Sequence, residues 1–492
     1  MTLRDLLVAV EPCEIAGNAD PVVLGLCYDS RRAKPGDLFF AWQGSQVDGH
    51  RFLPEAIRKG VVAIVGERDP APPSSGIPYT RVANAREAMA RVADRFYGHP
   101  SGSMEVVGIT GTNGKTTSAF LVHHILERSG TKTGLVGTIQ YRIGEEVLPA
   151  RRTTPEGSDL QGLLSAMRRS GCRAAVLEVS SHALAQGRVA GLRFAAGVFT
   201  NLTSDHLDYH GTLERYGAAK ALLFERLASA DEPAAAVLNA DDPAWHALGS
   251  ASCRPKRVFF YSARGAPEAD FRAEGVRKSA SGSSFLLTYP GGSLSVTIPM
   301  LGSFNVENAL AAFAAAFALG ISPRESASAL GAFPGVPGRM ERFASADGVV
   351  AVVDYAHTED ALRKTLAALR ELAPKRLGIV VGCGGDRDRT KRPKMAAAAC
   401  EMADRVVFTS DNPRSESIDR IFADMAAGVP AGSRPDWIPD RFLAIERSLR
   451  QAESGELICV AGKGHETTQE VRGVFHPFDD RSAVRKVLRA RG

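Results

Sequence analysis

The sequence lacks several features that mark particular classes of protein. Nowhere do about 18 apolar residues run uninterrupted, as a membrane helix requires, and the apolar stretch in MTLRDLLVAVEP is too short for a signal peptide. The seven cysteines are odd in number and scattered, without a C-x-x-C pair, which favours free thiols in a reducing compartment. Internal repeats, heptads and low-complexity segments are also absent. We therefore expect a soluble, cytoplasmic protein.

A strong charge of one sign is missing too. The chain has 60 basic and 55 acidic residues, a net charge of +5, and this mild excess does not by itself imply a nucleic-acid partner. A diffuse basic surface explains it, and so does a basic lining around an anionic nucleotide and an anionic substrate. A chain of 492 residues is too long for one core, so the usual domain size predicts about three domains.

The most informative stretch is MEVVGITGTNGKTT, residues 104–117, where an apolar run ends in a Gly-rich turn with Lys115. This pattern predicts a phosphate-binding loop, in which glycines turn backbone N–H groups toward an anion and Thr116 offers a hydroxyl to magnesium. A helical pattern follows, so the loop lies at a helix N-terminus, which favours phosphate. The loop departs from G-x-x-x-x-G-K-[ST], because Ile109 stands at the first glycine position.

The order of predicted elements indicates an α/β protein of three domains. Residues 1–100 form a small N-terminal α/β domain. Residues 101–336, in which strands alternate with helices, form a central P-loop-type domain with a mostly parallel sheet. The Pro- and Gly-rich segment FPGVPGRMERF, 333–343, is a linker. Residues 337–492 form a Rossmann-like domain whose buried strands each end in polar or Gly-rich residues, but the GxGxxG fingerprint of a dinucleotide site is absent.

Polar residues after the central strands are candidates for chemistry. Glu178 ends a hydrophobic strand, where it is either a magnesium ligand together with Thr116 or a solvated strand-end carboxylate. His206 and His210 have a spacing that suits a metal pair on a helix, but zinc is weakly supported and one of the two is as readily structural. Lys220 lies on a predicted helix among apolar neighbours, and by pattern alone it is a solvated lysine.

The third domain offers a site with fixed charges of both signs. Arg387 follows GCGGD and Arg414 ends DNPR, and paired arginines can grip a carboxylate. Asp411 and Asn412 can receive an ammonium, and Glu466 in GKGHE adds an acceptor. Such a site suits an amino acid. In the first domain, the SRR and GSQVDGH loops could bind a phosphate or a sugar, although on pattern alone an ordinary surface loop is the favoured interpretation.

These motifs, spread over nearly the whole chain, resemble the Mur ligase family, the ATP-dependent amide-forming enzymes of peptidoglycan precursor synthesis. The segments that carry the resemblance are TGTNGKTT, EVSSHAL, TNLTSDHLDYHG, GSFNVENALAA, GRMERF, DYAHTEDAL, GCGGDRDRTKRP, DNPR and AGKGHE. The family's phosphate loop shares the departure at Ile109. The arginine of DNPR resembles the members that add meso-2,6-diaminopimelate to UDP-N-acetylmuramoyl-L-alanyl-D-glutamate, because a second carboxylate on the acceptor needs a cation.

The resemblance implies a role for each matching residue. ATP is expected to contact Gly111, Thr112, Asn113, Gly114, Lys115, Thr116, Thr117, Asn305, Arg339 and Asp354. Magnesium is expected at Thr116, Glu178, His206 and Lys220, the last as a carbamate (N6-carboxylysine), with Lys115, Glu178, His206 and Lys220 catalytic. The UDP-sugar dipeptide is expected at Tyr28, Ser30, Ser45, Gln46, Val47, Arg152, Thr153, Thr154, Ser180, Gln186 and Arg188. Diaminopimelate is expected at Arg387, Asp411, Asn412, Pro413, Arg414, Gly462 and Glu466.

Some positions depart from the family pattern, and other functions stay open. Tyr28 stands where the residue is often aliphatic, and Arg152 where it can be asparagine. A lysine-adding ligase or a folylpolyglutamate synthase would use the same activation on another acceptor; Arg414 and the SRR and GSQVDGH loops argue against both. A nucleotide-binding scaffold that has lost ligation is a further alternative, which the intact Glu178, His206 and Lys220 disfavour. We expect a monomer that neither binds nucleic acid nor inserts into a membrane.

Overall fold

The computed structural model describes residues 1–10, 14–17, 19–44, 47–68, 76–228, 234–248, 255–279 and 281–491. Internal contacts divide the chain into two compact units. The first comprises Met1–Ser262, Ala266–Phe271 and Ala311–Ser326, and the second comprises Ala263–Gly265, Arg272–Leu310 and Ala327–Gly492. The division into three domains at residues 100 and 336 stays a prediction.

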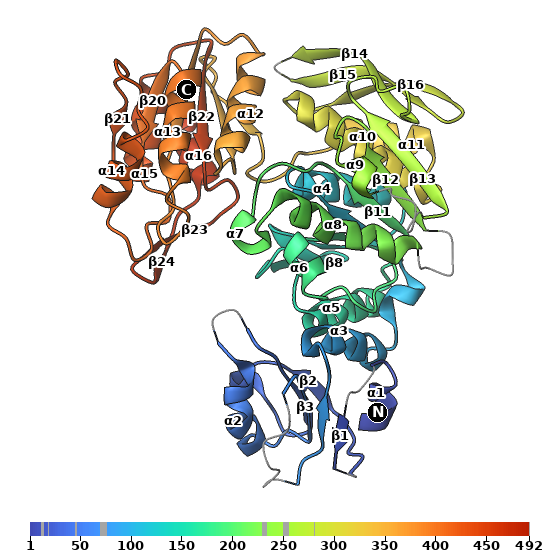
Figure 1. Ribbon diagram of the computed structural model, residues 1–492. Coiled ribbons are helices and arrows are strands. Elements are labelled where there is room, and N and C mark those ends of the chain that lie inside the picture. Colours follow the sequence, from blue (N-terminus) through green and yellow to red (C-terminus); the bar gives the residue numbers. More distant parts are fainter. Residues whose placement is uncertain are drawn as a thin grey trace. The chain divides into compact units, whose positions relative to one another are not determined.

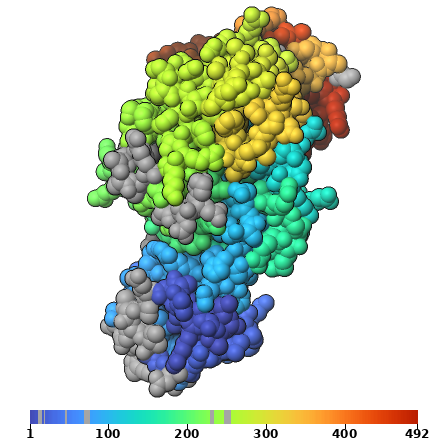
Figure 2. Space-filling view, turned by 90° about the vertical axis from the view of Figure 1, so that its right-hand side faces the viewer, coloured from blue at the N-terminus to red at the C-terminus, as the bar shows by residue number. Residues whose placement is uncertain are grey.

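The first unit begins with a five-stranded sheet of order β1-β5-β4-β3-β2, in which only β1 runs antiparallel to its neighbour. Figure 1 shows strands β1, β2 and β3 of this sheet, with helices α2 and α3, in blue. Every side chain of β3 is buried, as expected of a strand covered on both faces. Helix α3 packs its Ala88, Met89 and Val92 on this core, and Asn84, just before the helix, caps it by accepting from the N–H of Glu87. Figure 2 shows the surface of this region in blue. The elements are β1 Glu14–Ala16, β2 Gly25–Cys27, β3 Asp37–Ala41, β4 Ala63–Gly66, β5 Tyr79–Arg81, α1 Leu3–Leu7, α2 Leu53–Arg58 and α3 Ala85–Phe96, with 3₁₀ turns at Ser30–Arg32, Gly49–Phe52 and Pro100–Ser103.

The rest of the first unit is built on strands of order β13-β12-β11-β6-β10-β7-β8-β9. Strand β6 lies at the centre, parallel to β10 and β11, and the register places Ile109 beside Glu178 and Thr110 beside Phe199. The carboxyl ends of these strands therefore share one edge, as predicted. Strands β8 and β9 add an antiparallel edge. The elements are β6 Glu105–Thr110, α4 Lys115–Arg128, β7 Thr133–Val136, β8 Gln140–Ile143, β9 Glu146–Pro149, α5 Gly157–Arg169, β10 Ala174–Glu178, α6 Ser181–Ala185, β11 Ala196–Phe199, α7 Leu207–His210, α8 Leu213–Ala228, β12 Ala235–Asn239, α9 Trp245–Leu248 and β13 Arg257–Ser262.

The second unit contains an antiparallel run of three strands and a doubly wound sheet. The run is β14 Phe271–Ser279, β15 Gly282–Tyr289 and β16 Gly292–Ile298. Helices α10 Ser303–Ala318 and α11 Pro323–Gly331 follow it. Helix α10 is rich in alanine, and its residues are divided between the two units.

The doubly wound sheet has the order β17-β18-β22-β19-β20-β21, and only β17 is antiparallel. Its two faces carry separate cores. Val352 of β18 packs with residues of α12, α13 and α14, while its neighbour Val353 packs with residues of α15 and α16. This arrangement confirms the Rossmann-like prediction. The elements are β17 Glu341–Ala344, β18 Val350–Asp354, α12 Glu359–Arg370, β19 Arg376–Val381, α13 Lys391–Met402, β20 Arg405–Phe408, α14 Ile418–Ala426, β21 Asp436–Trp437, α15 Arg441–Arg450, β22 Glu456–Ala461, β23 Thr468–Val471, β24 Val474–Pro477 and α16 Asp480–Arg489.

Two features differ from the sequence-based prediction. The segment 333–343 is not linker throughout, because Glu341 already belongs to strand β17 and pairs with Val353. The chain between β22 and α16 forms a hairpin, β23–β24, whose strands pair with each other. It contacts the loop after β20 through a bridge between Arg414 and Val471 and through hydrogen bonds of Gln469 and Glu470. No helix among the described residues is both long and apolar enough to cross a membrane.

Candidate active site

The phosphate loop lies between β6 and α4, as its sequence predicts. Gly111 and Gly114 have φ of +146° and +86°, values that L side chains rarely adopt, so the turn needs glycine at both positions. Lys115 donates hydrogen bonds from Nζ to the carbonyl oxygens of Gly111 (2.9 Å) and Thr112 (2.8 Å). The loop therefore places a cation and the first amides of α4 beside one another, an arrangement that attracts phosphate.

Glu178 is not a solvated strand-end carboxylate but a fully buried one. The Thr116 hydroxyl donates to its Oε2 at 2.9 Å. The backbone N–H of Thr138 donates to Oε1 at 2.8 Å, and the Thr138 hydroxyl donates to Oε2 at 3.0 Å. The predicted Thr116–Glu178 pair is thus formed, and Thr138, which the sequence did not single out, fixes the carboxylate from the turn between β7 and β8.

Lys220 is buried as well, with 1% of its surface exposed on helix α8. Its Nζ lies 4.0 Å from the centre of the Tyr216 ring. Burial, aided by the charge of Lys115, holds the pKa of Lys220 well below the usual value of a lysine. The interpretation as a solvated lysine is therefore wrong, and a neutral amine is available at this position.

His206 and His210 have different environments. His206 precedes the short helix α7 with φ +54°, and its ring lies 6.1 Å from the ring of Tyr216, near Lys220. Burial lowers the pKa of His206, which favours the neutral imidazole that a metal requires. His210 is buried, and its Nε2 is 3.0 Å from the Ser181 hydroxyl, so it has a structural partner. Helix α7 is too short to present the two as an i, i+4 metal pair.

Of the predicted magnesium ligands, Thr116 and Glu178 suit a hard cation as they stand, whereas Lys220 would suit one only after carbamylation. Among the described residues, no group of three or more His, Cys, Asp or Glu side chains forms a metal cluster. Thr116 and Glu178 do bring two oxygen atoms together, which suits magnesium. Carbamylation of Lys220 would supply a further carboxylate on the His206 side.

The residues expected at the UDP-sugar dipeptide form a connected group around Thr154. Its hydroxyl donates to the carbonyl of Glu178 (2.8 Å) and accepts from the N–H of Ser180 (3.1 Å). Arg188 donates to the carbonyl of Thr154 at 2.9 Å. Glu156, buried and not predicted, lies against three guanidinium groups, those of Arg86, Arg152 and Arg188. The excess positive charge suits an anionic substrate.

The other members of this set have partners of their own. Thr153 and Thr138 share a hydroxyl contact of 3.0 Å, and Gln186 donates to Tyr209 at 3.1 Å.

In the N-terminal sheet region, the Ser30 hydroxyl donates to Glu55 at 2.7 Å, and the Tyr28 hydroxyl donates to Asp159 at 2.6 Å. Val47 is half exposed. Ser45 and Gln46 lie outside the described residues.

Asn305, Arg339 and Asp354, which are expected to contact ATP, belong to the second unit. Their contacts in the structure are with other residues of that unit. Both carboxylate oxygens of Asp354 accept backbone N–H groups, from Met340 (2.8 Å) and Ala356 (3.0 Å). The Asn305 amide donates to the carbonyl of Leu301 at 2.7 Å. Arg339 stacks over the Tyr355 ring at 4.4 Å. Asp354 thus shapes the backbone at the end of β18, and its part in nucleotide binding stays a prediction.

The residues expected at the amino acid meet at the carboxyl edge of the doubly wound sheet. Arg414, with φ +52°, donates to the carbonyl of Gly385 (2.7 Å), and its Nε lies 3.2 Å from Glu470. A Cβ added to Gly384 would lie 3.0 Å from the Arg414 guanidinium and 3.8 Å from Cγ of Arg387, so both arginines flank this glycine. The predicted pair of cations is therefore present at one edge.

The amide and acidic residues of this cluster also lie in close contact with one another. The Asn412 amide donates to Oε2 of Glu466 at 2.7 Å. Gly462, with φ +111°, approaches Asp411 so closely that an added Cβ would lie 2.8 Å from its carboxylate. Lys463, Gln469 and Glu470 also contact these loops, although sequence reasoning missed them. Lys463 lies inside the GKGHE motif, which was the available signal, whereas nothing local marks Gln469 or Glu470.

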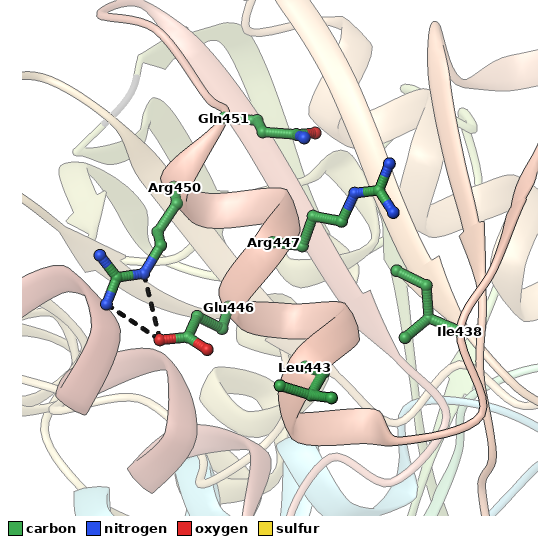
Figure 3. A pocket seen from close by; sticks show the side chains of 6 residues that line it. All are labelled: Ile438, Leu443, Glu446, Arg447, Arg450 and Gln451. Carbon is green, nitrogen blue, oxygen red and sulfur yellow. Dashed lines mark hydrogen bonds and ion pairs between the residues drawn. The ribbon is translucent and has the colours of Figure 1, made fainter.

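A hollow elsewhere on the second unit is separate from these residues. It is lined by Ile438, Leu443, Glu446, Arg447, Arg450 and Gln451, mostly on helix α15 (Figure 3). None of the predicted site residues lines it.

Three family models match the chain. The Mur ligase family, catalytic domain, matches residues 23–97, the Mur ligase middle domain matches 109–316, and the Mur ligase, glutamate ligase domain matches 338–464. The chain is 45% identical over 496 residues, covering 100% of both sequences, to a UDP-N-acetylmuramoyl-L-alanyl-D-glutamate–2,6-diaminopimelate ligase of Geobacillus kaustophilus. It is 44% identical over 488 residues to the protein of the same name from Listeria monocytogenes, covering 99% of this chain and 98% of the other.

Solved structures agree in fold. One titled UDP-N-acetylmuramoyl-L-alanyl-D-glutamate–2,6-diaminopimelate ligase superposes with a TM-score of 0.70 at 34% identity, covering 100% of this chain and 99% of the other. MurF from Thermotoga maritima in complex with ADP has a TM-score of 0.65 at 19% identity, covering 96% and 99%. The folylpolyglutamate synthase of Mycobacterium tuberculosis has a TM-score of 0.59 at 20% identity, covering 76% and 91%. The last two likenesses concern the fold alone.

Proposed function

The chain belongs to the Mur ligase family, and we propose on that basis that it joins meso-2,6-diaminopimelate to UDP-N-acetylmuramoyl-L-alanyl-D-glutamate at the expense of ATP. The observation that carries the proposal is the acceptor cluster. Arg387 and Arg414 flank Gly384, while Asn412 and Glu466 face each other nearby. Two cations beside fixed acceptors suit an amino acid with a second carboxylate.

The proposed reaction has two steps. In the first, the D-glutamyl γ-carboxylate oxygen bonds to the γ-phosphorus of ATP, and the bond to the bridging oxygen breaks to leave ADP and an acyl phosphate. In the second, the amine of diaminopimelate bonds to the acyl carbon, phosphate departs, and the nitrogen loses a proton. Lys115 and the amides of Gly111–Thr117 hold the phosphates and offset the negative charge that the transfer develops.

Magnesium would be held by Thr116 and Glu178, with a second ion at His206 and carbamylated Lys220. Bound there, it would neutralise charge between two anions, the carboxylate and the triphosphate. The lowered pKa of Lys220 supports the modification, because only a neutral amine attacks carbon dioxide, and the product is an anion. The buried Tyr216 ring beside Nζ keeps water away from that position.

We assign substrates to regions of the chain accordingly. Residues 1–100, with Arg152, Thr154 and Arg188, take the UDP-sugar dipeptide; residues 101–336 take ATP; and residues 337–492 take diaminopimelate. Asn305, Arg339 and Asp354 are assigned to ATP as well. The enzyme acts in the cytoplasm as a single chain, where its cysteines, free at the described positions, stay reduced.

Phosphate release tests the proposal. Purified chain is incubated with ATP, magnesium and the UDP-sugar dipeptide, and each amino acid is added in turn. We expect release with meso-diaminopimelate that stops when either the dipeptide or the amino acid is omitted. Turnover with lysine but not with diaminopimelate would refute the acceptor assignment. Release with glutamate on a folate substrate would favour the folylpolyglutamate alternative, and no release with any acceptor would favour a binding protein.

A further inference from the structure

We propose that Lys463 is the positioning residue of the acceptor site: it orients Asn412 and Glu466 so that both present their free atoms to the incoming amino acid. The proposal deepens the proposed function and rests on it, because it concerns the same loops at the edge of the doubly wound sheet. Lys463 is not itself a contact residue, since its side chain is 0% exposed.

The burial of Lys463 is unusual for its chemistry. A buried ammonium costs free energy unless it is paired and hydrogen-bonded, and lysine is rarely buried completely. Here Nζ donates to Oε2 of Glu466 at 2.8 Å and to Oδ1 of Asn412 at 3.0 Å. Both of its partners belong to the predicted acceptor site. The charge is therefore kept inside the fold at the point where it contacts two residues that are expected to bind substrate.

Lys463 decides which way the Asn412 amide faces. Oδ1 of Asn412 accepts from Nζ of Lys463 and from the backbone N–H of Glu470, at 3.0 Å each. Both groups are donors only, so the oxygen must face them and the nitrogen must face the other way. Nδ2 consequently donates to Glu466 at 2.7 Å and has a second N–H that can face an acceptor.

Lys463 also fixes the rotamer of Glu466. Its ammonium and the Asn412 amide both bind the same oxygen, Oε2, at 2.8 and 2.7 Å. The Glu466 side chain is 30% exposed, so the carboxylate is anchored through one oxygen while part of it stays accessible. A carboxylate held in this way is ready to accept from an ammonium group without first losing rotamer freedom.

The position of Lys463 in the sheet explains why one side chain can act on both loops. Lys463 follows β22 and Asn412 follows β20, and β19 lies between these strands. The end of β19 is rich in glycine, and a Cβ on Gly382 would lie 2.3 Å from the carbonyl of Thr409. The Lys463–Asn412 bond therefore joins the loops on either side of β19, which itself leads to Arg387.

A test compares Lys463→Met with Lys375→Met in the holoenzyme reaction. Lys375 is a matched control, because it also pairs with a glutamate, Glu453, at 2.9 Å, but both side chains are more than half exposed at 62% and 66%. We expect Lys463→Met to raise the KM for diaminopimelate about tenfold or more while the KM for ATP changes less than about twofold. The Lys375→Met variant should match the unaltered chain in both constants.

A change in the KM for diaminopimelate without a change in the KM for ATP distinguishes lost positioning from partial unfolding. Partial unfolding lowers the active fraction, and hence the apparent kcat, but leaves KM unchanged. Lys463→Arg keeps the charge and the donors and should recover part of the lost affinity. Equal changes in both KM values, or a Lys463→Arg variant no better than Lys463→Met, would overturn the proposal.

A double variant tests the route through Glu466. If Lys463 acts by orienting Glu466, then Lys463→Met combined with Glu466→Gln should raise the KM for diaminopimelate far less than the product of the separate effects. Effects that simply multiply would contradict the inference. The unaltered chain is assayed first: failure with every acceptor defeats the proposed function and this inference together. Turnover with lysine defeats only the acceptor assignment, and the same comparison is then made with lysine.

Discussion

At the residue scale, Lys220 depends most on its surroundings. Its amine is 1% exposed, near the cation of Lys115, and its pKa is held well below the ordinary value. We expect Lys220→Ala to lower kcat by about a hundredfold or more, because the proposed carbamate, which would hold a metal, cannot form. Added formate or acetate should restore part of the activity. The exposed Lys364, paired with Asp360, is the control; an active Lys220→Ala variant would count against the role.

His123 provides a prediction about pH. It lies buried on α4, and burial, with a smaller contribution from Arg142, lowers its pKa from 6.5 to about 4. The unfolded chain therefore binds a proton between these values that the folded chain does not, so stability is full above pH 6.5 and falls as pH drops toward 4. Between pH 7 and pH 5, the lowered pKa of His123 reduces the free energy of unfolding by about 2 kcal/mol.

The measurement is urea unfolding at both pH values. His123→Leu should lose about 2 kcal/mol less than the unaltered chain between pH 7 and 5. The control His476→Leu changes an exposed histidine and should leave the difference as it was. An unchanged pH dependence in His123→Leu would show that folding does not lower the pKa of His123.

At the element scale, the loop after β22 is held by a close approach of backbone. Gly338 has φ +66°, and an added Cβ would lie 2.1 Å from backbone atoms of both Gly464 and His465. Gly335 has φ +92° with nothing within 4 Å, so it isolates the cost of the backbone conformation. We expect Gly338→Ala to be destabilised beyond Gly335→Ala by about 1–3 kcal/mol in thermal unfolding. Equal losses of stability in Gly338→Ala and Gly335→Ala would mean that the backbone at Gly338 can move away from Gly464 and His465 without cost.

Some elements were readable from the sequence and others were not. The phosphate loop, Glu178 and the strand ends of the doubly wound sheet were predictable, because each is marked by a local pattern of apolar run and polar end. Thr138, Glu156 and Glu470 carry no such mark. Their roles arise from pairing between distant segments, such as β7 beside β10 or the hairpin β23–β24 against Arg414. The sequence-based interpretation of Lys220 as solvated was wrong because the residue is buried, and burial depends on the whole fold.

At the scale of the whole molecule, the residues fall into sets that match the two proposed steps. The first unit holds the phosphate loop, Glu178, His206 and Lys220, which would activate a carboxylate. The second unit holds the acceptor cluster around Arg414 and Glu466, which would supply the amine. In the proposed function, activation and acceptor choice belong to different parts of the chain. Substitutions in one set should then leave the affinity for the other set's substrate largely intact.

The central claim is that the first step produces an acyl phosphate and that the amine of diaminopimelate attacks it in the second step. The direct measurement uses a UDP-sugar dipeptide whose D-glutamyl γ-carboxylate is labelled with oxygen-18, incubated with ATP and meso-diaminopimelate. Mass spectrometry of the released phosphate should find one labelled oxygen per phosphate formed, because the carboxylate oxygen that attacks phosphorus leaves with it. Phosphate free of label, with the amide nevertheless formed, would contradict the account.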